Sequence, residues 1–229
     1  MHLCCGTHLC MTARHHAFIG VRINCCVFVR DHGKSQTENH CQILCCDYRD
    51  VPKLTSNKVY NKITCVEMSE HVGVWKYNAF LKQVSEQLQD DGIFYLQIAG
   101  LRRAWQFEDL LWGVFMGTYV FPGADASCPL AWNIWQLEGA GFEVSSVDNI
   151  GIHYSATLKR WYDNWVKNEA AISKKYKPEM FRKWRWFLAW AVIASEQGSA
   201  TCWQIVAHKN TCAWDRKRLI QERSKIWAQ

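Results

Sequence analysis

Two neighbouring strings of the sequence carry polar side chains directly after a hydrophobic run, and these side chains could do chemistry. NKITCVEMSEHVG, at residues 61–73, passes from an apolar strand pattern into Glu67, Ser69, Glu70 and His71. DDGIFYLQIAG, at residues 90–100, passes from a second strand pattern into Gln97. In an open parallel sheet, ligands bind just beyond the carboxyl ends of the strands. We therefore expect these two strand ends to form one wall of a reaction pocket.

The elements that must position these residues alternate between strand and helix patterns from Gly20 to Gly151. Strand candidates lie at residues 21–29, 42–46, 62–66, 92–96 and 142–147. Helix candidates lie at residues 77–88, which have a helical apolar period, and 130–140, which Gly141 closes. We expect a turn at 90–92 and a long aromatic-rich connection over 101–129. Such alternation predicts a parallel sheet covered by helices.

The pattern changes after Gly151. Helical patterns cover residues 155–168, 170–176 and 179–195, and TCWQIVAH at 201–208 predicts a closing strand. We find no internal repeat and no low-complexity linker. We therefore expect one domain over residues 1–212, followed by a charged helix within residues 213–229.

The composition is that of a globular protein, with 49% hydrophobic and 21% charged residues and only four Pro. No run approaches the ~18–20 apolar residues of a membrane span. The start lacks the charged and apolar regions of a signal peptide. We therefore expect a folded globular domain with no membrane span within residues 1–229.

Positive charge gathers in the C-terminal part of the chain. Residues 150–229 contain 15 Lys and Arg against six Asp and Glu, whereas residues 1–149 contain 12 against 15. A basic end in a chain with 13 Trp suggests an anionic partner, either a membrane face or nucleic acid. The alternative is a solvated basic face without a partner. We do not expect nucleic acid as a partner, because no base-reading motif appears.

Nine of the 12 cysteines precede residue 66, and several of them are adjacent pairs. Adjacent cysteines on a strand point to opposite faces, so most are expected to be small buried apolar residues. A metal site is the alternative, and its candidate ligands would be Cys4, Cys5, His8, Cys10, His15 and His16. Their spacing matches no common zinc pattern, so we expect no metal.

Six strings occur in order along the chain: DYRD, VEMSEHVG, DDGIFYLQIAG, FPGADAS, DNIGIHYSATLKRWYDNW and GSATCWQ. Together they resemble the cyclopropane-fatty-acid synthase family of S-adenosylmethionine-dependent methyltransferases. LQIAGLR, FMGTYVFPGADAS and IASEQGSATCWQ are similar to the fungal sphingolipid C9-methyltransferases in particular. The resemblance covers residues 33–210. It implies an α/β fold: a Rossmann-like class I methyltransferase sheet, with helices on both faces and a helical C-terminal insertion.

The resemblance implies methyl transfer to C9 of the unsaturated sphingoid base of a ceramide, in glucosylceramide biosynthesis. An alkene is a weak nucleophile, so it needs a sulfonium donor held in line in a dry pocket. The resulting carbocation needs negative charge and a base nearby. Glu70 and Tyr154 match family residues that help to hold a bicarbonate base. Gln97 stands where the family pocket uses His, so bicarbonate use is left open. The structural alternative for Glu70 is an acid at a helix N-terminus.

The resemblance also implies an S-adenosyl-L-methionine site with ligands from several strand ends. Its matching residues are Gly6 of the glycine-rich loop, Gly33, Lys34, Ser35 and Gln36 of a G-K-S-Q-T turn whose Gln contacts the ribose, Asp47 and Tyr48 beside the adenine, and Val66 and His71.

The N-terminal stretch departs from the family. Members open with a glycine-rich loop, DIGCGWG, that lets the backbone approach the cofactor. The nearest match here, LCCGTH at residues 3–8, has one Gly, so residues 1–32 look degenerate and the chain looks truncated at its N-terminus. Activity is therefore left open. The alternatives are a non-catalytic remnant that at most binds lipid or a membrane surface, and a cyclopropane-fatty-acid synthase acting on phospholipid acyl chains.

Aromatic segments at residues 105–112 and 161–190 fit the wall of an acyl-chain tunnel, with core packing as the alternative. A cluster of basic residues beside Trp184 and Trp186 suits a helix that lies on a membrane surface. Its members are Lys174, Lys175, Lys177, Arg182, Lys183 and Arg185. The resemblance implies a lipid substrate and a site on the endoplasmic reticulum membrane. The sequence does not determine the oligomeric state.

Overall fold

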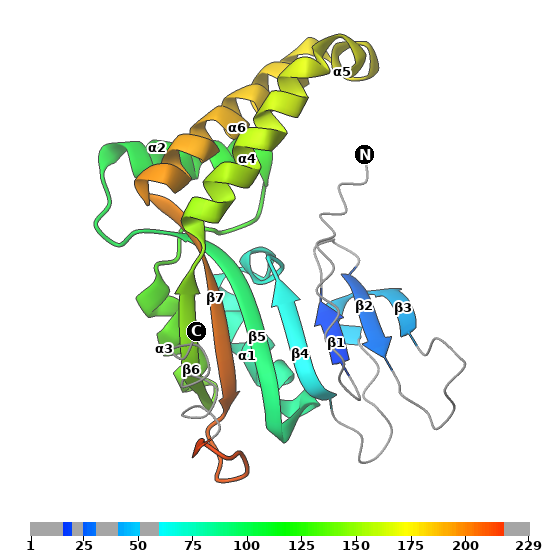
Figure 1. Cartoon of the computed structure of the whole chain (residues 1–229), viewed down its shortest axis with the longest axis vertical. Helices are drawn as coiled ribbons and strands as arrows, with labels where there is room; N and C mark the ends of the chain where they lie inside the picture. The colour runs from blue at the N-terminus through cyan, green and yellow to red at the C-terminus, as the bar shows by residue number, and fades with distance from the viewer. Residues whose placement is uncertain (1–15, 20–24, 31–40, 51–59, 218–229) are drawn as a thin grey trace, which may run out of the picture.

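A computed structural model of the chain describes residues 16–19, 25–30, 41–50 and 60–217 (Figure 1). Within these ranges, one mixed sheet has the strand order β3-β2-β1-β4-β5-β7-β6. The strands are β1 (His16–Ile19), β2 (Cys25–Arg30), β3 (Cys41–Cys46), β4 (Tyr60–Val66), β5 (Leu88–Leu101), β6 (Phe142–Asn149) and β7 (Ala200–Lys209).

The expectation of a parallel sheet is right for β1, β4 and β5 and wrong on both sides of them. On one side, β7 is antiparallel to both β5 and β6. β4 is parallel to β1 and to β5, whereas β2 is antiparallel to both β1 and β3. A parallel crossover needs a dozen or more residues. β1 and β2 are separated by residues 20–24, and β2 and β3 by residues 31–40. Both connections are too short for such a crossover, so these strands pair as neighbours in a meander.

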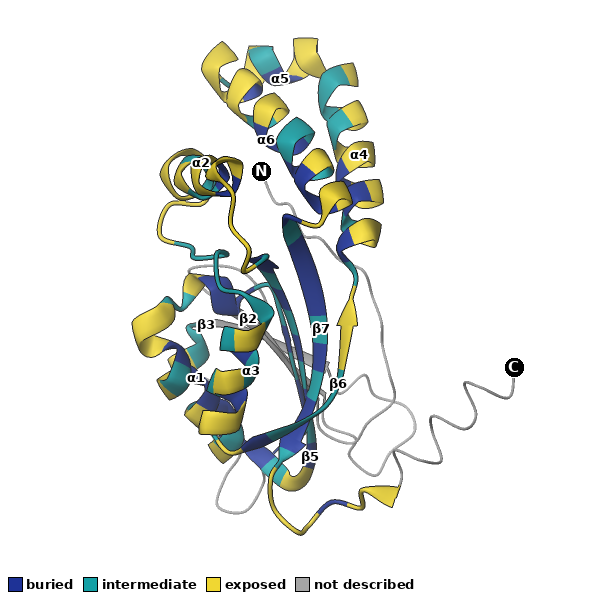
Figure 2. Cartoon of the chain, turned by 90° about the vertical axis from the view of Figure 1, so that its left-hand side faces the viewer, coloured by how far each residue is buried: buried dark blue, intermediate teal, exposed yellow. Residues whose placement is uncertain are grey.

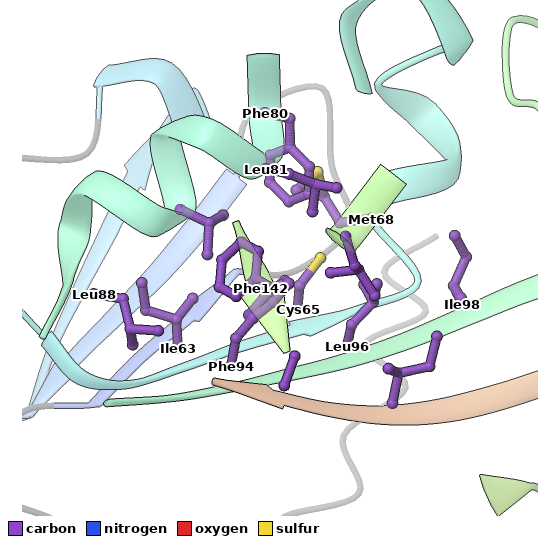
Figure 3. Close-up of a cluster of buried hydrophobic side chains, with 14 of the residues drawn as sticks. Ile63, Cys65, Met68, Phe80, Leu81, Leu88, Phe94, Leu96, Ile98 and Phe142 are labelled. Carbon is purple, nitrogen blue, oxygen red and sulfur yellow. The ribbon is translucent and has the colours of Figure 1, made fainter. Parts of the chain in front are cut away.

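Two helices lie on the same face of the sheet, α1 (Val74–Gln87) and α3 (Leu130–Gly139) (Figure 2). Apolar side chains of α1 meet alternate residues of the central strands, because strand side chains alternate between faces. Figure 3 shows this layer, in which Phe80, Leu81, Ile63, Phe94 and Leu96 lie between helix and sheet. Each of these five side chains is buried.

β5 is longer than its sequence pattern indicates. The expected turn at residues 90–92 is an irregularity inside the strand, because Leu88 pairs with Tyr60 and Ile93 pairs with Lys62. The intervening residues of β5 face a single residue of β4, which is a bulge. β5 therefore continues α1 directly and reaches Leu101 at the opposite edge.

The stretch 101–129 contains helices and is not simply a connection, so that part of the prediction is wrong. α2 (Phe107–Phe115) begins at a capping box between Gln106 and Asp109, and a π-helical turn (Met116–Val120) follows it. α2 has only nine residues, fewer than the window of about 11–18 residues in which a helical period stands out.

The C-terminal helices form an arm that projects from the sheet (Figure 1). They are α4 (Gly151–Lys167), α5 (Glu169–Lys175) at the far end, and α6 (Pro178–Gln197). Close to the sheet, Leu158 of α4 and Phe187 and Leu188 of α6 pack with Trp112 and Leu101 in a second core. Among the described residues, no helix is long and apolar enough to cross a membrane.

Other expectations are matched to within a few residues, including the helices at 130–140, 155–168 and 179–195 and the strand at 201–208. Short 3-10 turns follow β3 (Tyr48–Asp50) and β4 (Ser69–His71). The domain boundary at residue 212 stays a prediction. The N-terminal cysteine cluster and most of the expected terminal helix lie outside the described residues.

Candidate active site

The chain turns sharply where β4 ends. Glu67 has φ +51°, a left-handed conformation that costs a residue with a side chain roughly 1 kcal/mol or more. Its backbone N–H donates a 2.9 Å hydrogen bond to the carbonyl oxygen of Gln97 on β5. The turn therefore keeps the end of β4 joined to β5 and directs the chain into the 3-10 turn that contains Glu70.

A hydrogen-bonded network of side chains lies across these strand ends. The Nε2 amide of Gln97 donates to Glu67 Oε1 at 2.9 Å and to the hydroxyl of Tyr154 at 3.0 Å. Gln204 of β7 donates from Nε2 to Gln97 Oε1 at 3.0 Å. The Cys202 thiol lies 3.9 Å from Glu67 Oε1 and donates to it. Each donor meets an acceptor, so Gln97 is held in one orientation with its N–H groups toward the carboxylate.

Glu70 is the most deeply buried acid of the site, with 6% of its surface exposed. Its Oε1 accepts a 2.7 Å hydrogen bond from the backbone N–H of Ala99. Its Oε2 is buried and has no hydrogen-bond partner among the described residues. Burial raises the pKa of Glu70 to about 8, against the opposing effect of the Ala99 N–H. At neutral pH this carboxyl group therefore holds its proton and can donate a hydrogen bond.

Glu67 is half-buried and therefore lies closer to solvent than Glu70. Burial raises its pKa, while hydrogen bonds from Gln97 and Cys202 act in the opposite direction. The charge of Glu67 in turn raises the pKa of Glu70. The two acids thus have unequal surroundings, and they are close enough for the charge of one to change the pKa of the other.

An apolar cavity of about 300 Å³ lies next to this network. Its walls come from β5, α2, the π-helical turn and the loop that follows it, and its lining includes Leu101, Trp112 and Phe121. Glu67, Gln97 and Tyr154 are not in that lining. Two contacts connect cavity and network: Asp125 N–H donates to the carbonyl oxygen of Glu70 at 2.8 Å, and the ring of Phe121 meets His71 edge-on.

The residues expected at a nucleoside lie at the carboxyl ends of β3 and β4. Asp47 follows β3, and both its oxygens accept hydrogen bonds from Arg49, which lower its pKa to about 2. The ring of Tyr48 is half-buried and packs edge-on against Phe80. Val66 ends β4, and His71 is exposed on the turn beyond it. Gly6, Gly33, Lys34, Ser35 and Gln36 lie outside the described residues.

The structure thus brings together the three side chains expected to do chemistry, Glu70, Gln97 and Tyr154. The sequence pattern did not assign roles to Glu67, Cys202 and Gln204. Glu67 stands directly after a predicted strand, and this position indicates a residue of the expected pocket wall. The two β7 residues gave none, because their approach depends on the antiparallel register that pairs Gln97 with Gln204.

No metal centre is found in the part of the chain that the structure describes, where no three His, Cys, Asp or Glu residues converge as ligands. Of the six candidate ligands near the start, five lie outside that part, and the sixth, His16, begins β1.

Comparison with known proteins decides the family. The family model for mycolic acid cyclopropane synthetase matches residues 28–205. The chain belongs to this cyclopropane synthetase family. Among curated members, it is 56% identical over 173 residues to sphingolipid C9-methyltransferase A of Emericella nidulans. It is 55% identical over 187 residues to the sphingolipid C9-methyltransferase of Komagataella phaffii.

These relatives are much longer than this cyclopropane synthetase family member. The first alignment covers 76% of this chain and 33% of the relative, and the second covers 80% and 38%. The chain therefore spans about one third of the length of the relatives it matches.

Solved structures confirm the expected fold class. Mycolic acid cyclopropane synthase CmaA1, complexed with SAH and CTAB, superimposes with a TM-score of 0.69 at 19% identity, covering 77% of this chain and 63% of that one. A putative sarcosine dimethylglycine methyltransferase from Galdieria sulphuraria gives a TM-score of 0.56 at 9% identity, covering 67% and 54%. The cyclopropane synthetase domain is thus a Rossmann-like class I methyltransferase sheet, as expected.

Proposed function

We propose that this chain is a methyltransferase unit that uses S-adenosyl-L-methionine to methylate C9 of the unsaturated sphingoid base of a ceramide, in glucosylceramide biosynthesis. The observation that carries the proposal is the hydrogen-bonded network of Glu67, Gln97 and Tyr154, which lies with the buried acid Glu70 beside an apolar cavity. The identity of 56% to a sphingolipid C9-methyltransferase supports the substrate class.

The cofactor fits the carboxyl edge of β3 and β4. When bound, it supplies an electrophilic methyl group. Asp47 and Tyr48 would flank its nucleoside, and Val66 and His71 would contact it at the end of β4. The half-buried ring of Tyr48 and the exposed ring of His71 suit these roles. In this proposal Asp47 must share its oxygens with Arg49 or exchange that partner. Gly6 and residues 33–36 remain predicted contacts.

Glu70, Tyr154 and Gln97 would line the place where positive charge develops on the lipid. Glu70 offers a carboxyl oxygen that has no partner among the described residues, Tyr154 offers a hydroxyl, and Gln97 orients that hydroxyl. The apolar core around Tyr154 limits the access of water, so a cationic substrate carbon meets few competing nucleophiles. The base that removes the proton is left open by the family resemblance, in which bicarbonate is one candidate, and removing bicarbonate from the assay tests that candidate.

The cavity beside α2 is the proposed site for the hydrocarbon chain of the lipid. Its volume lies at the lower end of the range for small-molecule sites, and apolar side chains form most of its wall. Trp105 and Trp112 belong to that wall, as the sequence pattern predicts. The tryptophans of the second aromatic segment, such as Trp165 and Trp184, instead pack against Phe181 and each other within the arm.

A membrane surface is the proposed source of the lipid. α2 and its flanks expose a set of large apolar side chains beside the cavity: Trp105, Phe107, Leu110, Leu111, Val114 and Tyr119. The ammonium group of Lys183 lies 5.2 Å from the centre of the Tyr119 ring, so positive charge borders this apolar surface. Further exposed basic residues follow on α5 and α6. An apolar surface with a basic border suits an anionic bilayer, and the endoplasmic reticulum membrane is the proposed location.

The test is a reaction of the purified chain with isotopically labelled cofactor and a ceramide whose sphingoid base has a C8 double bond. Mass spectrometry should find the labelled methyl group on the sphingoid base. Proton NMR of the product then separates two outcomes of equal mass. A methyl-branched alkene keeps one vinylic proton and supports the proposal, whereas a cyclopropane ring has none and supports cyclopropane synthesis.

Calorimetry addresses the non-catalytic alternative separately. We expect heat from binding of S-adenosylhomocysteine to the chain. If the chain does not bind millimolar S-adenosylhomocysteine but still binds lipid vesicles, the enzyme proposal is refuted and a lipid-binding remnant is favoured.

A further inference from the structure

The two acids beside β4 are not equivalent, and their differences assign them different tasks. Glu70 is deeply buried, and the backbone N–H of Ala99 donates to its side chain. Glu67 is half-buried and accepts hydrogen bonds from an amide and a thiol. When two neighbouring carboxyl groups compete for one charge, the group with better access to solvent holds it.

The backbone at Glu67 provides a second, independent observation. Within the described residues, Glu67 is the only residue other than glycine with a positive φ. A glycine would adopt this turn without strain, so a glutamate here is costly unless its side chain has a use. Strain of this kind concentrates at functional sites.

The network also fixes where the carboxylate points. Gln204 occupies the oxygen of the Gln97 side chain, so the Gln97 amide hydrogens are committed to Glu67 and Tyr154. One amide group therefore holds the carboxylate and the phenol on the same side of β5. Gln97 is a positioning residue in this arrangement.

We propose that Glu67 is the proton acceptor of the reaction, taking a proton directly from the methylated lipid carbon, so that this chain needs no bicarbonate. The inference rests on the proposed function. It assigns to Glu67 the proton removal that a bound bicarbonate would otherwise perform. Glu70 keeps its own proton and serves as a hydrogen-bond donor.

The electrons and atoms of this step balance within the substrate and Glu67. The electron pair of the double bond forms the new bond between the lipid carbon and the methyl group, while the bond from methyl to sulfur breaks and its pair stays on sulfur. The adjacent lipid carbon becomes cationic. Glu67 then removes the hydrogen on the methylated carbon, and the released pair re-forms the double bond. The proton leaves Glu67 to solvent when the product departs.

The first experiment measures turnover of the full chain with ceramide in bicarbonate-free buffer. Wild type should be equally active with and without added bicarbonate. Glu67→Gln keeps the shape of the side chain and should lower turnover at least about 100-fold, the usual effect of losing a general base. Its affinity for S-adenosylhomocysteine should stay within twofold of wild type. Glu138→Gln, an exposed acid on α3, is the matched control and should change neither quantity.

The second experiment is independent of turnover. Carbon NMR of chains labelled at the glutamate carboxyl carbon, compared between wild type, Glu67→Gln and Glu70→Gln, assigns both resonances. At pH 7 we expect the chemical shift of a carboxylate for Glu67 and of a neutral carboxyl group for Glu70. A neutral Glu67 at that pH contradicts the inference.

The outcomes separate this inference from the function on which it rests. A wild-type chain that methylates ceramide only with bicarbonate, or that is unaffected by Glu67→Gln, overturns the role of Glu67 and leaves the function standing. A wild-type chain that transfers no methyl group under either condition refutes the function, and with it the proton-accepting role.

Discussion

The carboxyl group of Glu70 accepts a 2.7 Å hydrogen bond from the backbone N–H of Ala99, which ties the turn after β4 to the end of β5. That one bond is short, yet it does not compensate for the removal of a charged carboxylate from water. Glu70 consequently binds its proton more tightly in the folded chain than in the unfolded one, and the stability of the fold depends on pH.

The first prediction concerns this pH dependence. The pKa of Glu70 rises from 4.5 to about 8 on folding, so between these values the folded chain keeps a proton that the unfolded chain releases. The contribution of Glu70 to stability is therefore complete below pH 4.5 and is lost as the pH rises toward 8. Glu70→Gln cannot titrate, and its free energy of unfolding should exceed that of wild type by about 4 kcal/mol at pH 8.

Urea denaturation at several pH values between 5 and 8 measures the effect. The difference between Glu70→Gln and wild type should grow with pH. Glu86→Gln, an exposed acid on α1, serves as the control and should run parallel to wild type. A difference that is constant with pH contradicts the raised pKa.

The second prediction concerns the strained turn at Glu67. Glu67→Gly removes the cost of a left-handed side-chain residue, which is about 1 kcal/mol, and removes a partly buried acid. We expect the thermal midpoint to rise or stay level, although activity is lost. Val206→Gly, inside the extended strand β7, is the contrast and should lower the midpoint, because glycine weakens a strand. A lower midpoint for Glu67→Gly shows that the side chain is mainly structural.

The third prediction concerns the start of α2. Asp109 is 4% exposed and pairs with Arg102 at 2.9 Å, while also accepting the backbone N–H of Gln106. Arg102→Ala leaves that carboxylate buried without its partner, and we expect a loss of about 2 kcal/mol. Lys159→Ala breaks an exposed pair with Asp163 and should cost less than about 0.5 kcal/mol. Equal losses in chemical denaturation would mean that the Asp109 pair is no stronger than a surface pair.

The fourth prediction concerns the close approach of β5 and β7 beside the cavity. A Cβ added at Gly100 would lie 2.5 Å from the Trp203 ring and closer still to the carbonyl oxygen of Cys128. Gly100→Ala should therefore destabilise the fold by roughly 2 kcal/mol or more, because a packed core resists added atoms. A Cβ at Gly117 meets nothing within 4 Å, so Gly117→Ala should be nearly neutral. Thermal unfolding of both variants gives the comparison.

The fifth prediction concerns the membrane. Phe107 is 69% exposed on α2, and burying such a ring in a bilayer is worth about 1.5–3 kcal/mol. Phe107→Glu should weaken binding to vesicles of phosphatidylcholine and phosphatidylserine by about tenfold or more. Trp75 is 96% exposed on α1 and does not belong to the set of apolar residues on α2 and its flanks, so Trp75→Glu should leave binding unchanged. Equal effects in vesicle sedimentation contradict a surface centred on α2.

The sequence by itself determined the family and the central elements of the fold. The family could be recognised because several long motifs occur in a fixed order along the chain. The alternation of apolar residues around Ile63 and Phe94 predicts strands with one buried face, and the structure has such strands there. Glu70, Gln97 and Tyr154 could be selected because each stands in such a motif. The helical character of α2 was missed, since its nine residues are fewer than the window of about 11–18 residues in which a helical period stands out.

Only the tertiary structure decided which partners these residues have. Cys202 and Gln204 stand more than 100 positions from the residues that they contact, and their approach depends on the register between β5 and β7. The positive φ of Glu67 is likewise set by the path of the chain between β4 and the following turn. Cross-strand register and backbone strain arise from packing of the whole sheet, so no local pattern in the sequence specifies them.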